Sequence, residues 1–412
     1  MTPSREPGRI LMVMPYEQLV RKAVEAGFEV WSIWDPALRT PEYLDKVAAH
    51  SRELALVDFA DEAALRALVA ELARRHDVQH VLHLGSEATM APVLAEAEAL
   101  GLSPNTAESV RLLNDKHAMR GLLNAHGVSA VRARRAETLG EVEPLLAEFG
   151  LPAVVKPTNT AGSRGIALVR TAADLAEWTE RVKAGGFEGP FIIEDYLEGP
   201  EFSVETLTAG GTHHVVGITA KQTTGAPGFV ETGHIHPAPL DPEDAAAIRD
   251  TVTALLGLAG YAFGPAHTEV ILTPAGPRVV ESQARLGGDR IPLLVEVATG
   301  YDIEAAIFRG LAGEDVTAPA PHRYAAIGFF QLPAGRLESV DGLDGLRGRD
   351  HVHGVHFPYA PGDVLPRTTD SGTRHGYAVV DAPTPAEAAD RIAAARTALR
   401  TTTTQTPKEA LR

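Results

Sequence analysis

The sequence predicts an α/β protein with more than one domain, and three observations lead to this prediction. Its 412 residues are enough for about two or three domains of ordinary size. Over the first hundred residues, short apolar runs alternate with amphipathic segments, as in a parallel α/β domain. Further along, strand-like segments follow one another through short turns. We therefore expect a small parallel sheet first and an α+β arrangement after it.

The composition argues against several classes of protein. A hydrophobic content of 44% and a charged content of 22% are ordinary for a soluble globular enzyme. The net charge of −16 argues against a nucleic-acid partner, which would favour a basic surface. The absence of cysteine excludes disulfides, thiolate nucleophiles and Cys-bound zinc. Because there is neither a long apolar run nor an apolar signal core in residues 1–8, we expect a cytoplasmic protein without membrane contact.

Residues 1–106 predict the small parallel domain. A strand over 9–14 leads into a helix over 16–26, and a second strand follows over 28–34. The same alternation continues with a helix over 61–75, a strand over 78–84 and a helix over 88–100. No G-x-G-x-x-G follows the first strand, so the dinucleotide-binding fingerprint is absent.

Two lysines occupy positions that suit an anion. Lys116 opens a helix, where a cation opposes the helix dipole, so it is either simply solvated or part of an anion site. Lys156 ends a strand, and residues 157–165 form a glycine-containing loop before a return strand over 166–169. Such a loop and lysine can cradle phosphate, although a plain hairpin with a surface lysine is the alternative.

A hairpin with two facing acids gives the clearest chemical signal. Residues 267–272 and 278–283 read as strands joined by turn residues. If the pairing is symmetric about Ala275, Glu269 lies opposite Glu281 on one face. Facing like charges are destabilising unless a cation such as Mg²⁺ lies between them. The alternative is a surface hairpin with two solvated acids.

The segments around this hairpin extend the pattern. Arg285 and the turn 287–289 follow it directly and would bring an anion-binding group beside the proposed ion. The acidic connector 195–201 is either a solvated loop or a hinge that holds adenine and ribose. A Gly-, Ala- and Pro-rich stretch over 313–321 suggests a domain boundary.

Taken in order, these motifs resemble the ATP-grasp superfamily of carboxylate–amine ligases, most closely the L-amino acid ligases or dipeptide synthetases. The likeness runs from about residue 10 to 400 and rests on several separate motifs in the family's order. It implies an ATP-grasp fold with a Rossmann-like pre-ATP-grasp domain over 1–106 and an ATP-grasp domain over 107–315. Within the latter it implies a lid over about 125–193 and a hinge over 194–201. A C-terminal α+β subdomain over 316–400 and a disordered tail over 401–412 complete the expectation.

The resemblance also assigns roles to matching residues. Those expected to bind ATP are Lys116, Lys156, the closing loop Gly162, Ser163, Arg164 and Gly165, the adenine hinge Glu194, Tyr196 and Leu197, and the ribose ligand Glu201. The metal ligands are expected to be Glu269, Glu281 and Gln283, the last standing where the family usually has asparagine. The substrate pocket is expected to contain Glu231, His234, Arg285, Gly287, Gly288 and Asp289. Among these, Arg285 would face the acyl phosphate, and His234 or Glu231 would take the proton of the amine.

The function implied by this resemblance is an ATP-dependent ligase that forms an amide between two amino acids through an acyl phosphate, releasing ADP and phosphate. ATP and two Mg²⁺ ions are the implied cofactors, with Mn²⁺ as an alternative ion. The partners would be small carboxylate and amine substrates, within a homodimer that serves secondary metabolism. One alternative is an ATP-grasp carboxylase, or a ligase for a carrier protein or another acceptor. A catalytically silent nucleotide-binding protein is the alternative from another class.

Overall fold

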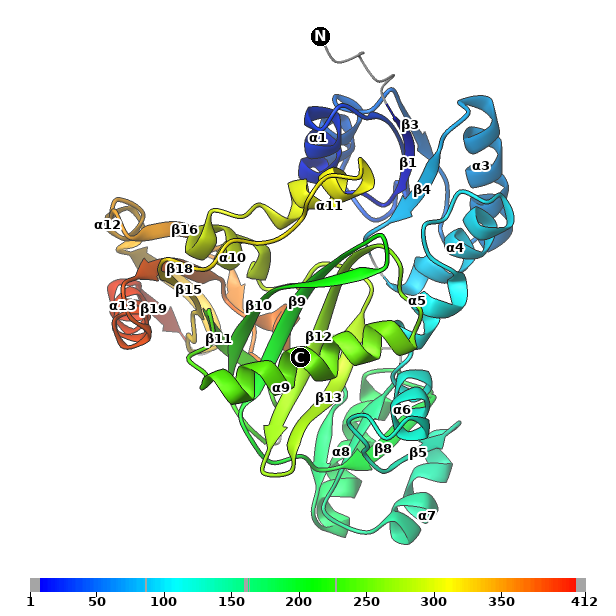
Figure 1. The fold of residues 1–412 in the computed structure, drawn as a ribbon. Helices are drawn as coiled ribbons and strands as arrows, with labels where there is room; N and C mark the ends of the chain where they lie inside the picture. The colour runs from blue at the N-terminus through cyan, green and yellow to red at the C-terminus, as the bar shows by residue number, and fades with distance from the viewer. Residues whose placement is uncertain (1–7, 86, 159–161, 163, 227, 405–412) are drawn as a thin grey trace.

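The N-terminal part is a four-stranded parallel sheet with helices on both faces. The computed structural model describes residues 8–85, 87–158, 162, 164–226 and 228–404 (Figure 1). The first sheet has the order β3-β2-β1-β4, from β1 (Arg9–Val13), β2 (Glu29–Trp34), β3 (Glu53–Leu56) and β4 (His80–His83). Its helices are α1 (Glu17–Glu25), α2 (Pro41–Ala48), α3 (Glu62–Arg75) and α4 (Met90–Ala99), the last preceded by the short helix η1 (Glu87–Thr89). Ile10 and Leu11 enter different hydrophobic clusters, because helices cover both faces. The predicted parallel domain is therefore confirmed.

The second sheet is antiparallel and lies at the opposite end of the molecule in Figure 1. Its order is β5-β8-β6-β7, from β5 (Ala133–Ala136), β6 (Ala153–Pro157), β7 (Ala167–Val169) and β8 (Phe191–Asp195). The helices α5 (Ala107–Asn114) and α6 (Lys116–Ala125) lead into it, and α7 (Leu139–Phe149) and α8 (Ala172–Ala184) pack on it. Trp178 on α8 is buried edge-on against Phe191 of β8, which anchors this helix.

The largest sheet has eight strands and carries the central hairpin at one edge. Its order is β13-β12-β9-β10-β11-β14-β18-β16. The strands are β9 (Glu201–Ala209), β10 (Thr212–Thr223), β11 (Glu231–His236), β12 (Gly264–Thr273), β13 (Gly276–Gln283), β14 (Tyr324–Phe329), β16 (Val352–His356) and β18 (Tyr377–Ala382). Helices α9 (Pro242–Leu258), α10 (Ile291–Thr299), α11 (Ile303–Leu311) and α13 (Pro385–Ala398) connect or follow them. The C-terminal strands thus extend the same sheet as the hairpin.

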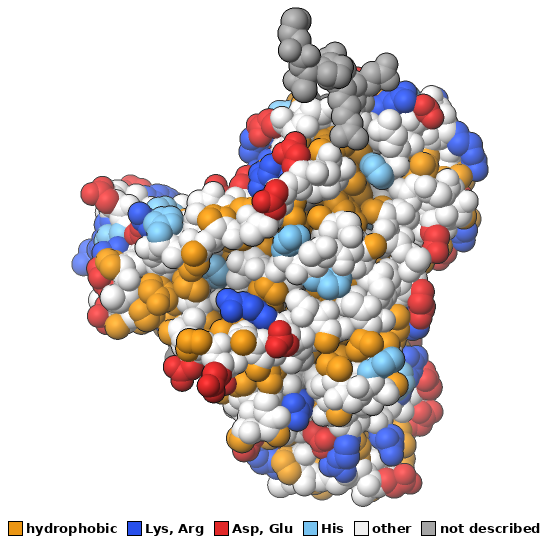
Figure 2. All heavy atoms as spheres, viewed as in Figure 1, with side chains coloured by type: hydrophobic (Ala, Val, Ile, Leu, Met, Phe, Trp, Pro, Cys, Tyr) orange, Lys and Arg blue, Asp and Glu red, His pale blue; other side chains and the backbone are white. Residues whose placement is uncertain are grey.

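The two faces of this sheet differ in chemistry. Helix α9 lies across β9, β10 and β12 in Figure 1, and its residues Val252 and Leu255 share a buried cluster with Phe202, Val204 and Val270. Figure 2 shows this side of the molecule, where acidic and basic side chains are interspersed on the surface. Because side chains alternate along a strand, the odd-numbered residues of β9 and β12 point to the other face. That face is polar.

One expectation at the C-terminus is wrong. Residues 401–412 were expected to form a disordered tail, but β19 (Arg400–Thr404) pairs with β15 (Gly335–Asp341). β17 (Val364–Leu365) completes this three-stranded sheet, near the short helices α12 (Leu343–Arg347) and η2 (Ser371–Thr373). The threonine run has the β-branched side chains that strands favour. Residue spacing does not show that β15 offers this run a partner strand. Residues 405–412 lie outside the described part of the chain.

Within the described part of the chain, no helix has the length and apolar character needed to cross a membrane.

Candidate active site

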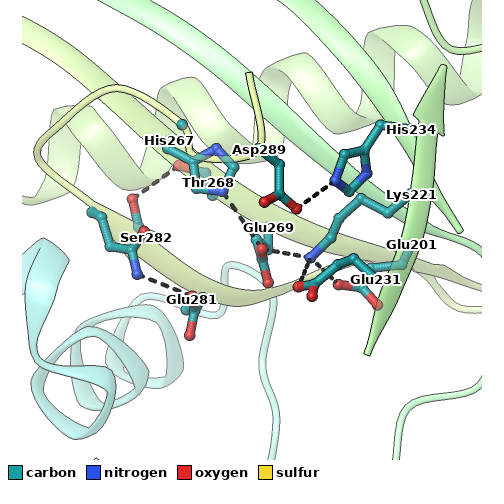
Figure 3. Close-up of polar contacts among 12 residues, drawn as sticks. Glu201, Lys221, Glu231, His234, His267, Thr268, Glu269, Glu281, Ser282 and Asp289 are labelled. Atoms are coloured by element: carbon teal, nitrogen blue, oxygen red, sulfur yellow. Dashed lines mark hydrogen bonds and ion pairs between the residues drawn. The ribbon is translucent and has the colours of Figure 1, made fainter. Parts of the chain in front are cut away.

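The candidate site is built on the polar face of the eight-stranded sheet. One cross-strand row contains Ser203, Glu269 and Glu281, and the next contains Glu205, His267 and Gln283. Both predicted acids therefore lie on neighbouring strands and on one face, as the sequence suggested (Figure 3). This pairing confirms the predicted register of Glu269 opposite Glu281.

A β-bulge produces this register. Near the turn, Thr273 pairs with Gly276 and Val270 pairs with Val279, whereas Glu269 pairs with Glu281. Val280 is therefore the extra residue, since no residue of β12 is opposite it. Without the bulge, every side chain beyond it would shift by one position and Glu281 would point to the α9 side. The bulge thus brings the second acid into the site.

A cavity of about 370 Å³ lies between the four-stranded antiparallel sheet and the polar face of the eight-stranded sheet. Its lining brings together most of the residues expected to bind ATP and metal: Lys116, Lys156, Gly162, Arg164, Glu194, Tyr196, Leu197, Glu201, Glu269 and Glu281. Ser163 lies outside the described residues. Gly165 forms the base of the loop, where its carbonyl accepts from the indole of Trp178 at 2.8 Å.

A third lysine, Lys221 on β10, lines this cavity and points toward Glu201, Glu231 and Glu269 (Figure 3). Its ammonium group contacts the carboxylates of Glu201 at 2.6 Å and Glu231 at 3.7 Å, and also that of Glu269. Burial opposes its charge, but the surrounding acids outweigh burial and raise the pKa of Lys221 well above its ordinary value. Lys221 is therefore a fixed positive charge among three acids, and sequence reasoning missed it.

The two lysines predicted from sequence are also paired with acids. Lys116 contacts Glu281 at 2.9 Å, and Lys156 contacts Glu194 at 2.9 Å. Burial would lower the pKa of Lys116, but Glu281 and the other acids nearby raise it on balance. Because a bound phosphate offers oxygens of the same charge as these carboxylates, both lysines suit phosphate binding.

Glu194 at the start of the hinge forms two buried ion pairs, one with Arg120 on helix α6 and one with Lys156 on β6. Its carboxylate accepts from Arg120 at 2.8 Å and from Lys156 at 2.9 Å. Burial alone would raise the pKa of Glu194, but Lys156 and Arg120 lower it to about 2. The side chain of Glu194 therefore belongs to this ion-pair network.

We expect the Glu194→Gln variant to be less stable by about 3–5 kcal/mol at neutral pH, because it leaves two buried cations without their anion. The pKa of Glu194 is depressed from 4.5 to about 2, so its stabilisation is complete above pH 4.5 and is lost as the pH falls toward 2. Urea unfolding between pH 3.5 and 8 measures the difference. It should shrink below pH 4.5, whereas a constant difference would refute the ionic explanation. Glu243→Gln, at an exposed position in the first turn of helix α9, serves as the control.

Glu269 and Glu281 fit a hard divalent ion. Both line the nucleotide-sized cavity, and both face cations, Lys221 and Lys116 respectively. The cations Lys221 and His267 outweigh burial and lower the pKa of Glu269 well below its ordinary value, so this ligand is ionised. Among the described residues, no group of three or more His, Asp or Glu side chains could hold a metal by itself. An ion here would therefore complete its shell with phosphate and water oxygens, as Mg²⁺ commonly does.

The third predicted ligand, Gln283, supports Glu281. Its amide Nε2 donates to Glu281 Oε1 at 3.0 Å. In this arrangement it fixes the orientation of a carboxylate expected to hold the ion. Partners of this kind commonly contribute to metal affinity without binding the metal.

A second cavity, of about 1130 Å³, contains the residues that follow the hairpin. Arg285, Gly287, Gly288 and Asp289 line it together with Glu87, which accepts from Arg285 Nε at 2.7 Å. The two cavities adjoin, because Glu231 in the first accepts a hydrogen bond from Ser371 in the second. The structure thus separates the predicted ATP residues from most of the predicted substrate residues.

His234 is buried behind Asp289 and does not line either cavity. Its Nε2 lies 2.9 Å from Asp289, and its Nδ1 is buried without a hydrogen-bond partner. Arg374 holds the same carboxylate with two nitrogens and stacks on Phe329, 3.6 Å from the ring centre. Although burial opposes ionisation of Asp289, His234 and Arg374 lower its pKa. His234 is therefore better placed to hold Asp289 than to meet a substrate.

Sequence reasoning missed several site residues besides Lys221. Glu87 and Ser371 lie on short 3₁₀ helices far from the hairpin in sequence, and Arg374 lies just beyond Ser371. These residues left no local signal. Glu205 did leave one, since it and Glu201 are acids four positions apart and therefore on one face of the same strand.

Two adjoining cavities, one lined by lysines and acids beside a small antiparallel sheet and one that contains Arg285, are typical of a nucleotide-dependent enzyme of the ATP-grasp class. Comparison with known proteins agrees. Residues 149–292 match the ATP-grasp domain family, and residues 328–404 match the L-amino acid ligase C-terminal domain 2. The chain therefore belongs to the ATP-grasp ligase family, in the group that carries the L-amino acid ligase C-terminal domain.

Individual relatives support this assignment. The chain is 31% identical to the uncharacterized protein y4rH of Sinorhizobium fredii, over 85% of this chain and 72% of that protein. It is 30% identical to alanine–anticapsin ligase of Bacillus subtilis, over 57% of this chain, and spans about half of that ligase's length, 54%. In fold it resembles the crystal structure of an L-amino acid ligase from Bacillus licheniformis. The TM-score is 0.82 at 24% identity, over 98% of this chain and all of the other.

Proposed function

We propose that this protein is an ATP-dependent ligase that joins two amino acids through an acyl phosphate and releases ADP and phosphate. One observation carries this proposal: three lysines and two facing glutamates line a cavity that adjoins the cavity containing Arg285. Such a layout supports phosphoryl transfer in one cavity and acyl transfer in the cavity beside it. The names of the relatives, alanine–anticapsin ligase and L-amino acid ligase, support amino acids as substrates.

In the first half-reaction, a substrate carboxylate oxygen attacks the γ-phosphate of ATP, and the bond from phosphorus to the ADP oxygen breaks. We assign Lys116 and Lys156 to the phosphate oxygens, which would replace the carboxylates that these lysines contact in the described structure. Mg²⁺ held by Glu269 and Glu281 would neutralise charge on the transferring group. We assign Tyr196 and Leu197 to the adenine and Glu201 to the ribose, because all three line the first cavity.

In the second half-reaction, the amine attacks the acyl carbon, and the bond from carbon to the phosphate oxygen breaks. The negative charge that develops on the acyl oxygen needs a fixed cation, and we assign Arg285 to it because it lines the substrate cavity and is oriented by Glu87. Glu231 is better placed than His234 to accept the proton of the amine, since it lines a cavity and His234 does not.

ADP release with Mg·ATP across the amino acids, singly and in pairs, with mass analysis of the products, tests this function. We expect release that requires two amino acids and a product whose mass is their sum less one water. Release with a single amino acid would indicate self-ligation or hydrolysis of the acyl phosphate. Lack of release with any amino acid or pair would contradict the proposed substrate class.

A further inference from the structure

A buried ion pair lies next to the proposed metal ligands, and the reaction described above does not use it. Glu205 on β9 and His267 on β12 are directly opposite each other in the sheet. His267 Nδ1 donates to Glu205 Oε1 at 2.6 Å. Glu205 is only 1% exposed and His267 only 6%. Two opposite charges buried at this depth lose much hydration, so the pair is a weak source of stability in itself. Its neighbours suggest another role.

The carboxylate of Glu205 also holds the turn formed by residues 285–289, which we call the substrate turn. Glu205 Oε2 accepts the backbone N–H of Gly287 at 3.2 Å. A Cβ atom on Gly287 would lie 2.8 Å from both Glu205 Oε1 and His267 Nδ1, closer than real side-chain contacts allow. The turn between Arg285 and Asp289 therefore lies directly on the ion pair, and glycine is the residue that permits this approach.

The histidine of the pair reaches the metal site. His267 Nε2 lies 3.5 Å from Glu269 Oε1, on β12 two residues away (Figure 3). Glu269 also contacts Lys221, which attracts Glu201 and Glu231 as well. His267 thus gives the carboxylate of Glu269 a second contact, on the same oxygen, Oε1, that Lys221 contacts.

We propose that Glu205 and His267 are positioning residues that hold the metal-binding carboxylate of Glu269 and the substrate turn 285–289 in one fixed relation. The inference rests on the proposed function, because it assigns an ion to Glu269 and a substrate to the turn. Its consequence is that a change in the substrate turn alters metal-dependent nucleotide binding. Partners that orient metal ligands typically contribute about 10–100-fold to metal affinity or activity.

The test is calorimetric binding of ADP with and without Mg²⁺ to full-length wild type, Glu205→Gln and Gly287→Ala. Both variants should weaken ADP binding about tenfold or more with Mg²⁺, and change it less than twofold without Mg²⁺. Both should also raise KM for the carboxylate substrate more than they lower kcat. Gly287→Ala is the more informative variant, because it keeps every ionisable group. If Glu205→Gln does not fold, the binding data for Gly287→Ala are sufficient for the test.

Thr268→Val is the matched control. Thr268 lies between His267 and Glu269 but faces the other side of the sheet, where it is fully buried and bonds Ser282 at 2.9 Å. It should lower the thermal midpoint and leave the Mg²⁺ dependence of ADP binding unchanged. Wild-type Mg²⁺ dependence in Gly287→Ala, or an equal change in Thr268→Val, would overturn the inference and leave the proposed function standing. Wild-type protein without Mg²⁺-dependent ADP binding would overturn both.

Discussion

The Glu281→Gln variant is expected to lose about 10³-fold in the rate of ADP release, the largest effect of any single substitution considered. The change removes one of the two facing carboxylates and replaces the anionic group that contacts the buried ammonium group of Lys116 with a neutral amide. A bound divalent ion supplies several kcal/mol of stabilisation during phosphoryl transfer, and each 1.36 kcal/mol corresponds to a tenfold rate. Steady-state ADP release at saturating Mg·ATP measures the effect.

The control for this prediction is Glu243→Gln, the same chemical change on helix α9 at the opposite face of the sheet. It should leave the rate within twofold of wild type. Raising the Mg²⁺ concentration should recover part of the Glu281→Gln activity, because the second acid, Glu269, remains. A rate near that of wild type in Glu281→Gln would show that the facing acids are a structural feature of the hairpin only.

The Arg285→Ala variant is expected to form the amide about 10²–10³-fold more slowly, by comparison with the loss of an oxyanion-stabilising donor in other enzymes. Arg285 lines the substrate cavity and is fixed by Glu87, so the variant removes a cation that is already oriented. The first half-reaction should be less affected. Single-turnover experiments that follow ADP and amide separately measure the two steps.

Two further variants make the Arg285 prediction specific. Arg285→Lys keeps the charge but loses the planar fork, and should recover only part of the rate. Arg278→Ala removes an arginine of the preceding hairpin that lies outside both cavities, and should have little effect. An equal loss of ADP and amide formation in Arg285→Ala would move this residue from the acyl step to ATP binding or phosphoryl transfer.

The sequence predicted those parts of the site that depend on local spacing. Glu269 and Glu281 could be placed opposite each other because side chains alternate along strands and the turn residues marked the centre of the hairpin. The turn is centred between Pro274 and Ala275, half a residue from the expected centre at Ala275. The bulge at Val280 compensates for this difference, so Glu269 still lies opposite Glu281. A symmetric pairing was thus correct for the acids and incorrect near the turn.

The remaining site residues depend on tertiary packing. Lys221 meets three acids only because β9, β10, β11 and β12 lie side by side, and strand order cannot be read from residue spacing. Arg374 reaches Asp289 because the C-terminal strands extend the central sheet. The same limit explains the error at β19, whose threonines form a strand because β15 offers them an edge.

Transfer of ¹⁸O from a labelled carboxylate tests the central claim most directly. The amino acid that donates the carboxyl group is labelled with ¹⁸O in that group and incubated with the enzyme, Mg·ATP and the amine substrate. Phosphorylation of the carboxylate predicts one ¹⁸O atom in the inorganic phosphate for each amide formed. Amide formation with unlabelled phosphate, or with the label in AMP, would contradict an acyl phosphate and with it the assigned roles of the two cavities.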